Sequence, residues 1–249
     1  MLKDLYLGAS FLFRGFSLLT KPGLKRFAIL PVMINVIVFS LLTWIGIHYF
    51  NDLLNWLLPA GEGWWEALAR TLLWLLFAFS ALLILFFTFS IVSNLIGSPF
   101  NSLLSEKVER YIEPSRPVEV STNAGGFLSE IPSSVLNEIR KIFYYLLFSA
   151  LILSLSVMPL ANIIFPFVWI IFTSWMLTLE YIGYPMENHG SVFADVRKAA
   201  GSKLGLSMGF GAAAMLCTLI PLVNLVIMPA AVAGGTLMWL EADLQNGKN

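Results

Sequence analysis

The sequence predicts an all-α integral membrane protein with a single membrane domain, residues 1–249, and two observations carry that prediction. The mean hydropathy is +0.80 and only 12% of the residues are charged, whereas soluble domains carry roughly 25%. The charges are also clustered, because residues 71–105, 142–179 and 204–240 contain none. About 20 apolar residues form a helix that crosses a bilayer. Each of these stretches is therefore long enough to enter or cross a membrane.

Residues 1–26 predict an interfacial helix followed by a basic turn. Asp4 and Arg14 bound the first apolar run closely and no small-residue cleavage pattern follows, so we expect no cleavable signal peptide here. An apolar stripe at near-helical spacing fits a helix that lies in the membrane interface, and it fits a helix packed on other helices equally well. The stripe consists of Leu2, Leu5, Tyr6, Ala9, Phe13 and Phe16.

Two long helices are predicted next, a first transmembrane helix at 27–50 and a second at 71–97. Gly97-Ser98-Pro99 is expected to interrupt the second helix. Residues 98–141 then hold most of the remaining charges and predict a cytoplasmic helical segment.

The last two charge-free stretches form an internal repeat, hairpin 1 at 142–179 and hairpin 2 at 204–240. Each contains a proline-bounded turn, at 159–166 and 221–229, that begins Pro-Leu-x-Asn and continues with branched apolar residues. The arms of about 16 residues give about 24 Å of helix, which is less than the hydrocarbon core of roughly 30 Å. The sequence leaves two alternatives open: re-entrant hairpins that only partly penetrate, or ordinary antiparallel transmembrane pairs.

The distribution of Lys and Arg orients the chain. Five of these residues lie in 1–26 and five in 98–141, against one in 51–70. Positive charge stays on the cytoplasmic side of a membrane. Both termini and the 98–141 segment are therefore predicted to be cytoplasmic, and 51–70 to face outward.

The sequence argues against an enzyme and against a cofactor. It contains no phosphate-binding G-x-x-x-x-G-K-[ST] loop, no H-E-x-x-H and no G-x-S-x-G. Two histidines and Cys217, all far apart, do not form a zinc site, and His189 near Glu187 is typical of a loop. Acidic residues that mark proton or cation paths are missing from the charge-free stretches. A net charge of zero also argues against nucleic-acid binding.

Residues 22–26, Pro-Gly-Leu-Lys-Arg, are the best candidate for a binding site. A helix N-terminus offers unpaired N–H donors and a partial positive charge, and Gly23 permits close approach of a ligand to the backbone. Lys25 adds a point charge, and Arg26 can donate two hydrogen bonds to one oxyanion. The pattern suits sulfate or phosphate. The alternative is that Lys25 and Arg26 only anchor the inner end of the first transmembrane helix.

Four groups of residues together have a pattern that is specific for one known family. They are Gly15 to Phe27 with Leu30-Pro31 and Asn35, Ser98 to Asn101 with Glu106, Tyr184-Pro185 with Asn188-His189, and Ile220 to Pro229. On these residues the chain resembles the CysZ family of bacterial inner-membrane sulfate permeases, and the resemblance covers almost the whole chain. It implies sulfate uptake into the cytoplasm for cysteine synthesis, a homo-oligomer in the lipid membrane, and hairpins that only partly penetrate.

By position, the sulfate site of that family falls on Gly23, Leu24, Lys25 and Arg26. One departure is Gly183, where the family often has an acidic residue just before the Tyr-Pro pair; any role of that acid is in doubt here. Since no nucleotide motif and no buried acid is seen, channel-like permeation of sulfate is expected. The alternative function is a membrane-shaping scaffold whose wedge hairpins bend the bilayer without transport.

Overall fold

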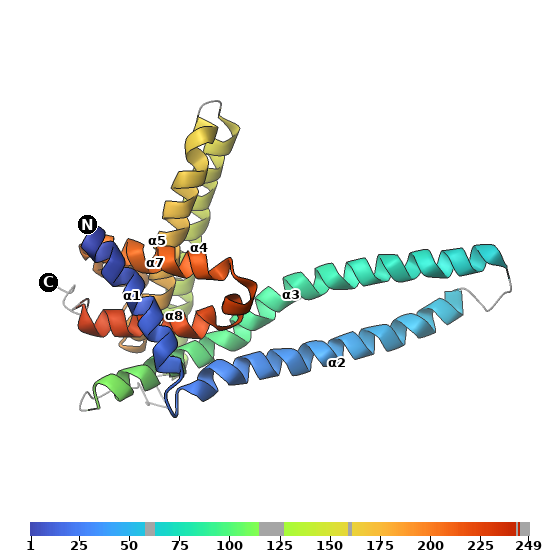
Figure 1. The fold of residues 1–249 in the computed structure, drawn as a ribbon, viewed down its shortest axis with the longest axis horizontal. Coiled ribbons are helices and arrows are strands. Elements are labelled where there is room, and N and C mark those ends of the chain that lie inside the picture. The colour runs from blue at the N-terminus through green and yellow to red at the C-terminus, as the bar shows by residue number, and fades with distance from the viewer. Residues whose placement is uncertain (58–62, 115–126, 159–160, 243, 245–249) are drawn as a thin grey trace. The chain divides into compact units, whose positions relative to one another are not determined.

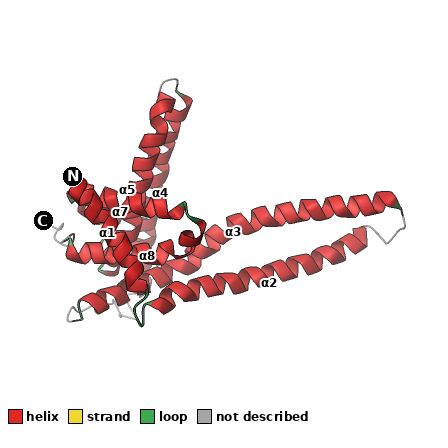
Figure 2. Cartoon of the chain, viewed as in Figure 1, coloured by secondary structure: helices red, strands yellow, loops and turns green. Residues whose placement is uncertain are grey.

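The computed structural model is helical throughout its described residues, with no strand among them (Figures 1 and 2). It describes residues 1–57, 63–114, 127–158, 161–242 and 244, without the side chains of 28, 31–32, 35, 39, 57, 82–99, 127–138, 221–222 and 225. The helices are α1 Leu2–Leu19, α2 Lys25–Leu57, α3 Trp64–Ile112, α4 Phe127–Val157, α5 Ala161–Asn188, α6 Phe193–Ser202, α7 Leu204–Thr218 and α8 Pro221–Glu241. The predicted all-α class is confirmed.

The chain divides into two units, one formed by Met1–Ala28 with Asn101–Asn249 and the other by Ile29–Phe100. In the second unit, α2 lies beside the first part of α3 (Figure 1). The Phe50 ring stacks on the Phe77 ring with centroids 3.9 Å apart, and the Trp74 ring meets Phe50 edge-on at 4.8 Å. Aromatic contacts between neighbouring helices therefore hold this pair together.

Three helical windows among the described residues are long and apolar enough to cross a membrane, Val36–Trp56, Ile139–Val157 and Ala161–Asn188. Many apolar side chains on these helices are exposed, as expected where lipid is the solvent. The side chains of 82–97, in the predicted second transmembrane helix, lie outside the described ones. Where the predicted segments sit in a bilayer stays a prediction.

Helix α3 differs from its predicted form. Its backbone is helical from Trp64 to Ile112, including 97–99, so Gly97-Ser98-Pro99 does not interrupt it. A proline removes only one backbone hydrogen bond, and membrane helices tolerate that loss where neighbouring groups supply a partner. The first transmembrane helix also extends beyond its predicted 27–50, because α2 begins at Lys25 and ends at Leu57.

The two repeated stretches form the helical hairpins α4–α5 and α7–α8. Their turns are shorter than predicted, because α5 begins at Ala161 and α8 at Pro221. Pro166 and Pro229, expected to end the turns, lie inside helices instead. Pro159 lies outside the described residues. The arms are also unequal: α7 has 15 residues, about 22 Å of helix, whereas α5 has 28.

Helix α1 packs on α7 and α8, across which it lies in Figure 1. Glycines allow the backbones to approach, since an added Cβ at Gly8 would come 2.0 Å from the Leu206 carbonyl oxygen. A Cβ at Gly15 would come 2.1 Å from that of Ala230. Half of the predicted stripe does not form this contact, because Leu2, Tyr6 and Phe13 are exposed. The buried face consists of Gly8, Phe11, Leu12, Gly15, Leu18 and Leu19. Gly8 and Gly15 let the backbone of α1 approach α7 and α8 closely on this face. A search for apolar residues does not detect such positions, because glycine has little hydropathy.

A bidentate ion pair also joins α1 to α8. Arg14 Nη1 donates to Glu241 Oε2 at 2.6 Å and Arg14 Nη2 donates to Glu241 Oε1 at 2.5 Å. The hydrogen bonds that Arg14 donates to the Glu241 carboxylate raise the pKa of Arg14, so the guanidinium stays charged. The orientation of α1 is thus fixed by a polar clamp as well as by its glycine face.

Candidate functional site

The residues between α1 and α2 form a tight turn at the candidate sulfate site. Helix α1 ends at Leu19, and the hydroxyl of the following residue, Thr20, donates to the Ser17 carbonyl oxygen at 2.7 Å. The Lys21 carbonyl oxygen then accepts the N–H groups of Leu24 at 3.2 Å and Lys25 at 3.4 Å. This closes a single turn before α2 begins.

Gly23 has the backbone conformation that makes this turn possible. Its φ is +88°, in the left-handed region, and an added Cβ would meet nothing within 4 Å. Glycine is the residue that adopts this region without steric cost. The open space over Gly23 also means that a ligand can reach the backbone there.

Leu24 fixes the turn to the body of the first unit. Its side chain is 3% exposed and belongs to the same buried apolar cluster as Leu18 and Leu19 at the end of α1. Burying a leucine side chain contributes about 1.5–3 kcal/mol. Leu24 therefore acts as an anchor that positions the polar residues around it.

Backbone donors are available on either side of that anchor. Among the described backbone hydrogen bonds, this turn uses the N–H groups of Leu24, Lys25 and Phe27, and none uses the N–H of Gly23 or Arg26. Unpaired N–H groups at a helix start are the donors that bind oxyanions. The turn therefore retains two donors for a ligand.

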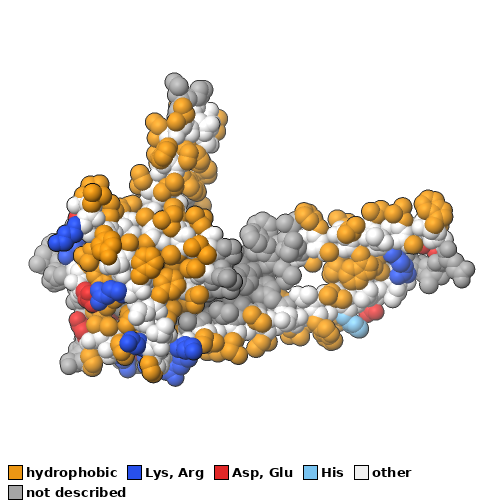
Figure 3. Space-filling model, in the orientation of Figure 1, with side chains coloured by type: hydrophobic (Ala, Val, Ile, Leu, Met, Phe, Trp, Pro, Cys, Tyr) orange, Lys and Arg blue, Asp and Glu red, His pale blue; other side chains and the backbone are white. Residues whose placement is uncertain are grey.

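Three cationic side chains surround these donors. Lys21, Lys25 and Arg26 are exposed, and none of them forms an ion pair with a carboxylate that the structure describes. Arg26 rests its guanidinium carbon 5.1 Å from the centre of the Phe27 ring. Lys and Arg side chains gather on the surface where α2 begins (Figure 3). The local charge surplus attracts an anion.

The first turn of α2 carries positive charge where the helix dipole is also positive. Lys25 and Arg26 are in the first turn, which contains no acidic residue, although cations there oppose the helix dipole by about 0.3–1 kcal/mol each. A bound dianion would reverse this penalty. The structure thus brings all four predicted residues, Gly23, Leu24, Lys25 and Arg26, into one turn, and the assignment of sulfate to them stays a prediction.

A buried contact between a carboxylate and an imidazole, which the sequence interpretation missed, lies elsewhere in the first unit. Glu109 of α3 is fully buried, and both of its carboxylate oxygens lie 2.9 Å from His189 Nε2. The centroid of the His189 ring lies 5.1 Å from that of the Trp239 ring in α8. The same two helices, α3 and α8, are also joined by a hydrogen bond of 2.9 Å between the hydroxyls of Ser105 and Thr236. The sequence placed His189 in a loop near Glu187, and the residue does lie in the turn after α5. Its contact with Glu109 was missed because the two residues are far apart in sequence and no spacing signal links them.

A second polar chain connects α3 to α5 and α4. Asn101 Nδ2 donates to the Tyr184 hydroxyl at 3.2 Å, and that hydroxyl donates to Glu180 Oε1 at 3.3 Å. Glu180 also pairs with Lys141 Nζ at 2.8 Å. The resembled family often carries an acidic residue at position 183, which is a glycine in this chain. Here the carboxylate that is hydrogen-bonded to Tyr184 belongs to Glu180, one turn earlier in α5.

Comparison with known proteins agrees with the resemblance. Residues 11–229 match the family model described as Sulfate transporter CysZ/Etoposide-induced protein 2.4. A Pseudomonas aeruginosa protein named Sulfate transporter CysZ is 39% identical, over 95% of each chain. Proteins of the same name from Pseudomonas syringae and Pectobacterium atrosepticum are 37% and 33% identical over 94% of this chain, covering 92% and 84% of their own lengths.

Proposed function

We propose, because this chain belongs to the Sulfate transporter CysZ/Etoposide-induced protein 2.4 family, that it transports sulfate across a membrane and receives the dianion at the turn before α2. Gly23 and Arg26 would donate backbone N–H groups to sulfate oxygens. Lys25 and Arg26 would neutralise its two charges. Leu24 would hold the turn in place.

The observation that carries this proposal is the combination of spare donors and spare cations in one turn. The N–H groups of Gly23 and Arg26 have no partner among the described backbone bonds, and Lys25 has no described carboxylate beside it. An oxyanion with several acceptor oxygens would use all of these groups at once.

The finer features of the proposal follow from the sequence pattern. Transport would be uptake across the bacterial inner membrane, by channel-like permeation, for cysteine synthesis in a homo-oligomer with cytoplasmic termini. The distribution of Lys and Arg supports that orientation. The exposed apolar surface of the helices supports a lipid environment, and no nucleotide motif suggests a driving force other than the sulfate gradient.

Uptake of labelled sulfate into vesicles tests the proposal. Vesicles reconstituted with the full chain should accumulate sulfate. The Lys25→Ala/Arg26→Ala variant should bind sulfate at least about tenfold more weakly, because a hydrogen bond to a charged group contributes about 1.5–3 kcal/mol. Lys3→Ala is the matched control, since it removes an exposed cation of α1 outside the turn. It should leave uptake unchanged.

Two results would count against the proposal in different ways. Vesicles that become tubular without any sulfate flux would indicate the membrane-shaping alternative. Normal binding by the double variant would remove the turn from the mechanism while leaving transport itself intact.

A further inference from the structure

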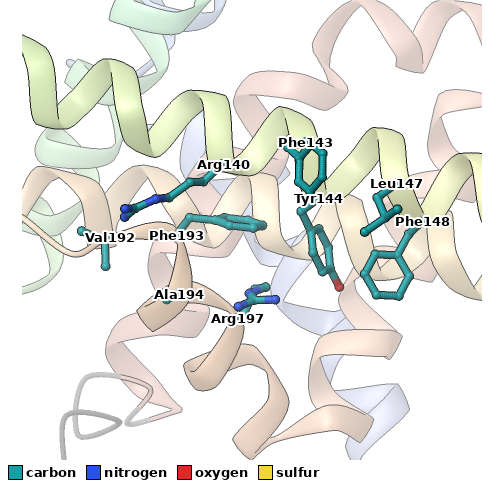
Figure 4. A pocket seen from close by; sticks show the side chains of 9 residues that line it. All are labelled: Arg140, Phe143, Tyr144, Leu147, Phe148, Val192, Phe193, Ala194 and Arg197. Carbon is teal, nitrogen blue, oxygen red and sulfur yellow. The ribbon is translucent and has the colours of Figure 1, made fainter.

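A cavity lies between α4 and α6, and none of residues 20–26 lines it. Its volume is about 400 Å³, and it is open to the surface. Two arginines line it together with mostly apolar and aromatic side chains, as Figure 4 shows. The lining consists of Arg140, Phe143, Tyr144, Leu147, Phe148, Val192, Phe193, Ala194 and Arg197.

The polar end of the cavity is preorganised by aromatic stacking. The Arg197 guanidinium carbon lies 5.0 Å from the centre of the Tyr144 ring and 5.5 Å from that of Phe193. Tyr144 is itself fixed, because its hydroxyl accepts a hydrogen bond from Trp175 Nε1 at 3.1 Å. Stacking on ring faces leaves the edge N–H groups of the guanidinium free to bind an anion.

Arg140 provides a second cation across the same opening. In Figure 4 the Phe193 ring lies between the Arg140 and Arg197 side chains. Both arginines are exposed, and neither pairs with a carboxylate among the residues that the structure describes. Two guanidinium groups around one opening attract a group with more than one anionic oxygen.

The other end of the cavity is apolar and continues along α4. Leu147 and Phe148 lie at the far end of the row from Arg140 (Figure 4). Leu147 is 44% exposed, and Leu151, one turn further on, is 56% exposed. This is the surface of the window Ile139–Val157, which is apolar enough to cross a membrane. The cavity thus joins a cationic opening to a surface suited to acyl chains.

From this graded polarity we propose that the cavity binds one anionic phospholipid. Arg140 and Arg197 hold the phosphate, and the acyl chains lie along Leu147, Phe148 and Leu151. The Tyr144–Trp175 pair fits the headgroup level, where aromatic side chains are enriched. Basic pockets beside membrane helices bind anionic headgroups in the same manner. A zwitterionic lipid carries an ammonium group that the two arginines repel, so charge selects phosphatidylglycerol over phosphatidylcholine.

Native mass spectrometry of the full chain in detergent tests this site, with phosphatidylglycerol and phosphatidylcholine of identical acyl chains as probes. The wild-type chain should retain phosphatidylglycerol preferentially. Arg140→Gln should lower that retention about fivefold, and Arg140→Gln/Arg197→Gln about 25-fold, since each cation near an anionic lipid contributes about a factor of five. Lys3→Gln, which removes an exposed cation that does not line the cavity, should leave retention unchanged.

Three results would overturn the site. These are equal retention of the two lipids by the wild-type chain, undiminished retention by Arg140→Gln, and displacement of the lipid by an equal concentration of inorganic phosphate. The last result would indicate a site for free anions. The double variant removes the stacking of Arg197 on Tyr144 and Phe193, which can disturb folding. The single variant Arg140→Gln avoids this problem, because Arg140 has no such ring contact in the described structure.

Discussion

Replacing Gly23 with alanine separates the backbone contribution of the turn from its charge. A Cβ at this position would meet nothing within 4 Å, so the substitution causes no clash. Its cost comes from φ = +88°, a left-handed conformation that costs an L-residue about 1–2 kcal/mol. The turn can avoid this cost by returning φ to a negative value. That change would redirect the N–H groups offered to sulfate.

If sulfate binds only to the left-handed turn, the conformational cost appears as lost affinity. Since each 1.4 kcal/mol is a factor of ten, Gly23→Ala should weaken sulfate binding about 5- to 30-fold. Gly23→Asn should lose less, because asparagine tolerates the left-handed region better. Equilibrium titration of the purified variants in detergent measures both effects.

Gly190 offers a matched control for this experiment. It also has a positive φ, +71°, and an added Cβ there would likewise meet nothing within 4 Å. Gly190→Ala therefore carries the same kind of backbone cost at a turn without Lys25 and Arg26. It should bind sulfate as the wild type does. Equal affinity for Gly23→Ala and wild type, or an equal loss in Gly190→Ala, would refute the reasoning.

Two further predictions concern stability. Gly211→Ala should lower the thermal unfolding temperature markedly, because its Cβ would lie 1.8 Å from the Ser174 carbonyl oxygen and overpacking costs about 1–3 kcal/mol or more. Gly201→Ala in helix α6 is the control and should be neutral or stabilising, because its Cβ would meet nothing within 4 Å. Equal unfolding temperatures for the two variants would contradict this reasoning. His189→Ala should also lower the free energy of unfolding, by about 1–3 kcal/mol, because it removes the imidazole from the fully buried Glu109 carboxylate. An unchanged midpoint of denaturant unfolding would show that the contact between these two residues does not stabilise the fold.

The helical class and the hairpins were predictable because charge-free stretches and repeated prolines are local signals. The exact turns were not, since a proline can begin a helix or lie within one. Pro221 begins α8, while Pro229 lies inside it. Only the neighbouring helices decide whether the lost backbone hydrogen bond is tolerated.

That Gly23, Leu24, Lys25 and Arg26 share one turn was predictable because they are consecutive, while sulfate binding there stays a prediction. What the sequence did not reveal was the packing that holds the turn in place. The glycine face of α1 was overlooked in favour of its apolar stripe, although Gly8 and Gly15, seven residues apart, were a usable signal for close helix packing. The pairing of Glu109 with His189 had no such signal.

Sulfate titration of the purified chain by calorimetry, with chloride at equal ionic strength as reference, tests the central claim most directly. The account predicts saturable sulfate binding that is tighter than chloride binding and is lost in Lys25→Ala/Arg26→Ala. No heat with sulfate from a wild-type chain whose circular dichroism shows intact helices would contradict it.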